Sequence, residues 1–121
     1  MAFNEHDMYE NVRKNLRREY PASEDWVIYR KDRWDGYEPD FVVERACCGR
    51  IERVIVEVKA ECMARRSHVD QLNRYARNLA GGNAVIVKKI LVYPAGVRNT
   101  DIIPDDIEVR RLKNFKCEWN R

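Results

Sequence analysis

The sequence predicts an α/β fold in which a mixed β-sheet is flanked by helices. Two segments carry apolar residues at helical spacing, several short segments are rich in β-branched residues, and the two kinds are interspersed along the chain. With 121 residues, of which 45% are hydrophobic, the chain has enough apolar side chains for one core of ordinary size. We therefore expect a single domain that spans residues 1–121.

The first predicted element is an amphipathic helix over residues 5–20. Its apolar side chains recur with the 3.6-residue period that places them on one helical face; they are Met8, Tyr9, Val12, Leu16 and Tyr20. Pro21 follows directly and cannot continue a helix.

Three β-strands are predicted next. Residues 26–29 are rich in β-formers, and residues 41–43 and 51–58 form two further apolar runs joined by a turn that contains Gly49. If this hairpin folds symmetrically about Gly49, residue 40 lies near residue 58. Asp40 is then expected beside Glu57.

The second half of the chain predicts a helix and two strands. Residues 67–80 have a helical apolar period and end before Gly81 and Gly82. Residues 84–93 are largely apolar and predict a strand. Residues 107–112 alternate between apolar and charged side chains, which indicates a half-exposed edge strand.

Charge and cysteine usage limit the class of protein. The 23 basic and 20 acidic residues give a net charge of +3, which permits an anionic partner without requiring one. No apolar run approaches the roughly 18 residues of a membrane span, and no signal peptide is visible, so we expect a cytoplasmic protein without membrane contact. The four cysteines lack a Cys-x-x-Cys pair, which favours reduced thiols over a cysteine-based metal module.

Charged residues interrupt the strand at residues 51–58. Because side chains alternate along a strand, Glu57 and Lys59 share a face, and an unpaired charge in an apolar interior costs several kcal/mol. Such charges usually pair, bind a metal or line a wet cleft. Two adjacent carboxylates, Asp40 and Glu57, suit Mg²⁺, a hard ion that prefers oxygen ligands. The structural alternative is that Glu57 and Lys59 form an ion pair and Asp40 caps a turn.

The order Pro39-Asp40, then Glu57-Val58-Lys59 after a hairpin, resembles the signature of the PD-(D/E)XK nucleases. This superfamily includes restriction endonucleases, Holliday junction resolvases and RecB-type nuclease domains, and the resemblance covers about two thirds of the chain. It implies a restriction-endonuclease-like fold and hydrolysis of nucleic acid, with DNA as the expected substrate and Mg²⁺ or Mn²⁺ as the metal. Asp40, Glu57 and the carbonyl of Val58 are the implied metal ligands, and Lys59 the residue that serves the attacking water.

Further residues join this hypothesis. Gln71 and Tyr75 resemble the Gln-x-x-x-Tyr motif of RecB-type nucleases, in which they support the site or the bound strand. The family also brings an acidic residue from the first helix; Glu5 lies on the apolar stripe and is favoured, with Glu10 as the alternative.

Five other positions are considered for a role at the site. Arg65 and Arg66 follow the Glu-x-Lys strand and are candidates for phosphate contact. Trp34 and Tyr37 would stack on unpaired bases or pack within the fold. His68 is interpreted as a surface or rim histidine.

The sequence thus predicts a metal-dependent nuclease. A dimeric Holliday junction resolvase is the rival within this class. A catalytically idle module that binds nucleic acid or a protein partner is the rival outside it. A domain of this size is also expected to dimerise or to use a protein partner for specificity.

Overall fold

The structure is a computed structural model that describes residues 3–31 and 38–119. Two helices and five strands account for most of them. The elements, in chain order, are α1 (Glu5–Glu19), η1 (Ala22–Glu24), β1 (Val27–Arg30), β2 (Phe41–Cys47), β3 (Arg50–Val58), α2 (Arg66–Leu79), β4 (Ala84–Ala95), η2 (Thr100–Ile102) and β5 (Ile107–Lys116).

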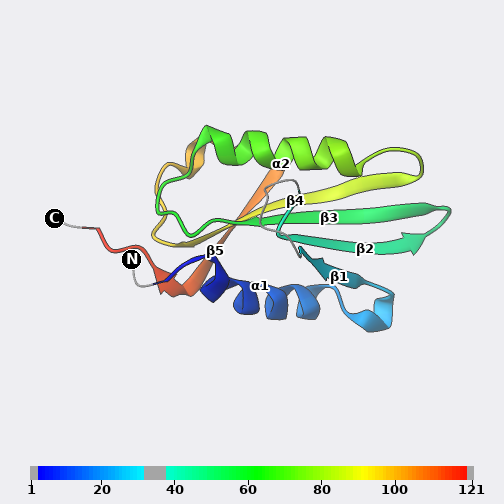
Figure 1. Ribbon diagram of the computed structural model, residues 1–121, viewed down its shortest axis with the longest axis horizontal. Coiled ribbons are helices and arrows are strands. Elements are labelled where there is room, and N and C mark those ends of the chain that lie inside the picture. The colour runs from blue at the N-terminus through cyan, green and yellow to red at the C-terminus, as the bar shows by residue number, and fades with distance from the viewer. Residues whose placement is uncertain (1–2, 32–37, 120–121) are drawn as a thin grey trace.

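The five strands form one mixed sheet in the order β1-β2-β3-β4-β5. The β1–β2 and β2–β3 pairs are antiparallel, whereas the β3–β4 and β4–β5 pairs are parallel. Helix α2 makes the connection that a parallel β3–β4 pair requires. Figure 1 shows α1 and α2 on opposite faces of the sheet. The predicted α/β fold, a mixed sheet flanked by helices, is confirmed.

Strand β3 separates two cores. Val54, Val56 and Val58 face the cluster that includes the buried side of α1, whereas Ile55 faces the cluster under α2. This alternation is the one that the sequence pattern predicts. Because β3 is covered on both faces, a polar side chain at its end must find partners within the protein.

The β2–β3 hairpin turns at Cys48 and Gly49, which both have positive φ, 62° and 80°. Two-residue turns with two positive φ angles match the twist of antiparallel strands. Phe41 pairs with Val56 and Cys47 with Arg50, so continuing this register places Asp40 opposite Glu57. The predicted register, with residue 40 near 58, was one position off because the turn is centred between Cys48 and Gly49.

The helices begin and end close to their predicted limits. Asn4 caps α1: its side chain accepts a hydrogen bond from the N–H of Asp7, whose carboxylate accepts one from the N–H of Asn4. Tyr20 follows the last helical residue, directly before Pro21. Helix α2 ends at Leu79, and Gly81 and Gly82 follow with positive φ.

Strand β5 extends to Lys116, four residues beyond its predicted end, and a disulfide follows it. Cys117 is bonded to Cys62, which lies in the loop between β3 and α2, 55 residues earlier in the chain. The expectation of reduced thiols is wrong for these two cysteines and holds for Cys47 and Cys48, which are free. Sequence spacing gave no sign of the pair because folding alone brings the two segments together.

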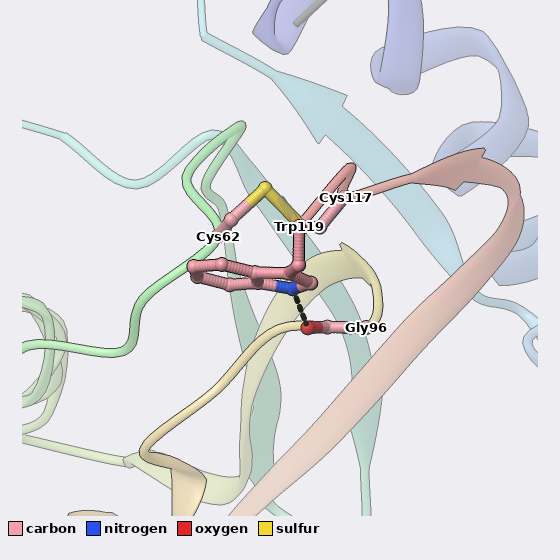
Figure 2. The surroundings of a disulfide bond; sticks show 4 residues. All are labelled: Cys62, Gly96, Cys117 and Trp119. Atoms are coloured by element: carbon pink, nitrogen blue, oxygen red, sulfur yellow. Dashed lines mark hydrogen bonds between the residues drawn. A yellow bond between two sulfur atoms is a disulfide. The ribbon is translucent and has the colours of Figure 1, made fainter. Parts of the chain in front are cut away.

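The disulfide lies beside an aromatic contact near the end of the described chain. Figure 2 shows the Trp119 indole next to the disulfide, with its Nε1–H donating a hydrogen bond of 2.8 Å to the carbonyl of Gly96. The Arg98 guanidinium lies over the Trp119 ring, 3.7 Å from its centroid. The residues after β5 are thus anchored to the β4–η2 loop.

None of the helices within residues 3–31 and 38–119 is long and apolar enough to cross a lipid bilayer.

Candidate active site

Asp40 is the centre of the candidate site. It directly precedes β2, is 1% exposed, and its N–H donates a 2.8 Å hydrogen bond to Glu57 Oε1. Its own Oδ2 accepts a 2.6 Å bond from the main-chain N–H of Val58. The predicted proximity of Asp40 and Glu57 is therefore present, and main-chain hydrogen bonds hold both carboxylates in place.

Glu57 is 2% exposed at the end of β3. Burial, followed by the negative charge of Asp40, raises the pKa of Glu57 to about 7. The Lys59 ammonium, 3.5 Å from Glu57 Oε2, acts in the opposite direction without cancelling these effects. A second cation at this carboxylate would favour its charged form, as a bound metal does.

Lys31 is a site residue that sequence reasoning missed. Its ammonium lies 2.6 Å from Asp40 Oδ1, and its main-chain N–H donates a hydrogen bond to the main-chain carbonyl of Asp40. Burial alone would lower the pKa of Lys31, but the hydrogen bond and charge of Asp40 outweigh it and the pKa is raised. When residues 27–30 pair with residues 41–44, the next residue pair is Lys31 and Asp40. Lys31 could therefore have been found only from the order and register of these two strands.

Helix α1 brings two further groups. The Tyr9 hydroxyl donates a short hydrogen bond to Asp40 Oδ1, and burial together with that bond raises the pKa of Tyr9. Burial, followed by the charge of Asp40, also raises the pKa of Glu5, so Glu5 lies within electrostatic reach of the site. Glu10 is exposed and pairs with Arg13 at 2.8 Å. Of the two predicted candidates, Glu5 is the one near Asp40.

Lys59, Gln71 and Tyr75 form a chain of hydrogen bonds from β3 to α2. The Lys59 ammonium donates to Gln71 Oε1 at 2.6 Å, and Gln71 Nε2 donates to the Tyr75 hydroxyl at 3.0 Å. Tyr75 is 1% exposed, so in this structure it supports Gln71 and has no surface for a substrate. The two motif residues thus fix the position of the Lys59 amine.

An open pocket of about 440 Å³ lies beside Lys59, along the start of α2. It is lined by Lys59, Glu61, Arg65, Ser67, His68, Asp70, Gln71 and Arg74. Arg65 lines it while pairing with Glu61 at 3.1 Å; Arg66 does not line it and lies 3.6 Å from Asp70. Of the two predicted phosphate contacts, Arg65 faces this pocket, and Arg74 is a lining cation that sequence reasoning missed.

His68 is buried, so its interpretation as a surface or rim histidine was wrong. It is 3% exposed; its Nδ1 accepts from the Tyr93 hydroxyl at 2.8 Å and from the Arg65 N–H at 3.3 Å. Nε2 therefore carries the proton and donates to Glu61 Oε2 at 2.9 Å. Burial lowers the pKa of His68, which favours this neutral form. Periodicity placed His68 at the border of the apolar face, but only the fold supplies Tyr93.

The donor set fits a hard divalent cation. In the described ranges, no three His, Cys, Asp or Glu side chains converge as a metal-binding group. Mg²⁺ does not require three, because it usually binds through one or two carboxylates and retains several waters. Asp40 and Glu57 supply the carboxylates, and burial together with the charge of Asp40 raises the pKa of Glu57, so a bound cation would favour its charged form. Lys31 holds one Asp40 oxygen and would share it with the ion.

Trp34 and Tyr37, considered for base stacking, lie outside the described residues. Comparisons with protein families, curated proteins and solved structures find no match for this chain.

Proposed function

We propose that this chain is a metal-dependent nuclease of the PD-(D/E)XK type that hydrolyses phosphodiester bonds in nucleic acid, with DNA as the expected substrate. The observation that carries the proposal is the pair of buried carboxylates, Asp40 and Glu57, held together beside the Lys59 amine. The pocket next to Lys59, which Arg65 and Arg74 also line together with two carboxylates, is where the phosphate backbone would bind. This use of Asp40, Glu57 and Lys59 follows the residue order on which the family resemblance rests.

Asp40, Glu57 and the carbonyl of Val58 would hold Mg²⁺ or Mn²⁺. When bound, the ion supplies Lewis-acid stabilisation of the phosphate and lowers the pKa of a bound water. Lys59, positioned by Gln71, places positive charge where negative charge develops on the phosphate. Arg65 and Arg74 line the pocket and would bind neighbouring phosphates.

The test is cleavage of labelled single-stranded, double-stranded and branched DNA and RNA, with Mg²⁺, Mn²⁺ or EDTA. We expect cleavage in the presence of Mg²⁺ or Mn²⁺ and none in EDTA. The cleavage rate should fall by roughly 100- to 1000-fold in Asp40→Asn and Lys59→Met. Lys88→Met, a matched change at an exposed lysine of β4, should retain the wild-type rate. Calorimetry should show that Mg²⁺ binding is lost in Asp40→Asn and retained in Lys59→Met.

One observation favours an idle module as the second candidate. The Lys31–Asp40 ion pair offsets one buried carboxylate without any metal. If no substrate is cleaved and calorimetry detects no Mg²⁺ binding, the nuclease proposal is overturned and a module that binds nucleic acid or a protein takes its place. Preference for branched DNA together with a dimeric state would instead indicate a junction resolvase.

Glu5 and Glu10 provide a matched pair on α1. Glu5→Gln removes a charge within electrostatic reach of Asp40 and Lys59, so we expect cleavage to fall by about tenfold, less than for a general acid or base. Glu10→Gln changes a surface pair with Arg13 and should cleave at the wild-type rate. The measurement is the initial rate of cleavage at saturating Mg²⁺. Equal rates for the two variants would contradict a role of Glu5 in the site.

A further inference from the structure

A second, larger groove lies along α1 and β5. Its volume is about 800 Å³, and it is lined by Asn11, Arg13, Lys14, Asn15, Arg17, Arg18, Arg111, Leu112, Lys113 and Asn114. Six of these residues are basic, three are asparagines and none is acidic. These six positive charges exceed the net charge of +3, so the remainder of the chain is net negative. The basic character of the protein is thus concentrated in this groove.

Arg13 in the groove pairs with Glu10, but other groove cations have no carboxylate partner in the part of the chain that the structure describes. Among the described residues, Lys14, Arg18 and Lys113 have no carboxylate within ion-pair distance, and all three are exposed. Arg18 and Arg111 donate to the neutral side chains of Asn15 and Thr100, which leaves their charge in place.

Several cations on other elements are paired with a carboxylate. Arg45 lies 2.8 Å from Glu52, and Lys89 lies 2.6 Å from Asp106. Positive charge that is exposed and unpaired in one groove attracts an anionic partner.

The arrangement of the groove fits a repeating anion. Lys14 and Arg18 are one helical turn apart, and Lys113 adds a cation from β5, so the charges are spread along the groove. Asparagine side chains are suited to donate to phosphate and sugar oxygens. No aromatic side chain lines the groove among the described residues, so bases have no stacking surface there. Its apolar residue Leu112 is 6% exposed, which leaves little surface for lipid chains.

Helix α1 connects this groove with the candidate active site. Glu5 lies near Asp40, and Lys14 is nine residues farther along the same helix, about 13 Å at 1.5 Å per residue. A duplex rises about 3.4 Å per base pair, so this length corresponds to roughly four base pairs.

We propose that the groove along α1 and β5 binds the phosphodiester backbone of nucleic acid, without sequence preference, about four base pairs or more from the cleaved bond. The placement relative to cleavage rests on the proposed nuclease function, whereas backbone binding by the groove does not. Binding and cleavage are therefore measured separately.

The test is fluorescence anisotropy of labelled DNA with the full chain in EDTA, where metal-dependent cleavage cannot occur. Affinity is measured between about 50 and 300 mM salt for the wild type and for the triple variant Lys14→Ser/Arg18→Ser/Lys113→Ser. Each lost phosphate contact lowers the slope of log affinity against log salt by about 0.7 for single strands and 0.9 for duplex. We expect the slope to fall by about two to three, with affinity at least tenfold weaker at 100 mM salt.

A matched variant separates the groove from net charge alone. Arg50→Ser/Arg77→Ser/Lys88→Ser removes three positive charges outside the groove and should change the slope by less than one. The proposal is overturned if the two triple variants lose affinity equally, or if the groove variant binds DNA like the wild type. It is also overturned if the groove variant loses only its binding to vesicles of phosphatidylserine and phosphatidylcholine, which would assign the groove to a membrane surface.

The two proposals fail in distinguishable ways. If the groove variant binds DNA more weakly and the wild type cleaves no substrate with any metal, the groove proposal is supported and the nuclease proposal is overturned. Normal DNA binding by the groove variant, with metal-dependent cleavage intact in the wild type, would do the reverse.

Discussion

In metal-free buffer, the free energy of unfolding should fall as the pH rises from about 4.5 to about 7. Burial and the charge of Asp40 raise the pKa of Glu57 from its ordinary 4.5 to about 7. Between these values the folded state keeps a proton that the unfolded state has lost. The stabilisation is therefore complete below pH 4.5 and is lost as the pH passes the folded pKa, with a total change of roughly 3 kcal/mol.

Glu57→Gln isolates this contribution. His68 has the opposite effect, because its lowered pKa makes stability rise with pH below its ordinary value of 6.5, and the effect is common to both proteins. At pH 8 the variant should be more stable than the wild type by about 2 kcal/mol, since glutamine keeps an acceptor for the Asp40 N–H but loses the Lys59 pair. Urea denaturation at a series of pH values measures the difference.

Added Mg²⁺ should remove the pH dependence in the wild type alone. A metal that binds the folded state stabilises it by about 2.7 kcal/mol at a concentration of 100 times its dissociation constant. Glu57→Gln should gain nothing from Mg²⁺ and should not cleave nucleic acid. A pH difference between the two proteins that is absent, or that persists unchanged in Mg²⁺, would contradict the assignment of Glu57 as a metal ligand.

Loss of the Cys62–Cys117 disulfide should lower the free energy of unfolding by about 4 kcal/mol, the chain-entropy value for a closed loop of about 55 residues. Its physical reason is that the cross-link restricts the unfolded chain. The double variant Cys62→Ser/Cys117→Ser and the reduced wild type should agree in urea denaturation. Cys48→Ser, which changes an exposed free cysteine, should match the oxidised wild type.

The candidate site should survive this loss. Main-chain hydrogen bonds hold the Cys62 loop independently: the Arg98 N–H donates to the Cys62 carbonyl at 2.9 Å, and the Ala64 N–H donates to the Arg98 carbonyl at 2.8 Å. The double variant should thus be less stable yet fold. The titration of four free thiols in the unreduced, denatured wild type, where two are expected, would show that the bond does not form.

The sequence predicted the elements whose signals are local. The helical period of Met8, Tyr9, Val12 and Leu16 reports the buried face of α1, because one helix packs one stripe on a sheet. A glycine turn between two apolar runs predicted the hairpin that brings Asp40 to Glu57. Asp40 and Glu57 lie at the open end of this hairpin, so their proximity could be predicted from the sequence.

The groups missed by sequence reasoning depend on contacts between distant segments. Lys31 reaches Asp40 through the β1–β2 pairing, His68 is buried against Tyr93 of β4, and Cys117 meets Cys62 across 55 residues. None of these contacts produces a periodic pattern. They follow from the order of strands in the sheet, which propensity and spacing do not determine.

Strand β5, which supplies one wall of the basic groove, is also the last strand of the sheet on that side. An edge strand offers unpaired main-chain groups to the edge of another molecule, and long charged side chains such as those of Arg111 and Lys113 hinder that approach. The same positive charge therefore acts against self-association through strand pairing. Removing the positive charges of the groove takes away this hindrance, so aggregation can begin at the β5 edge. High salt has the same effect because it screens the charges.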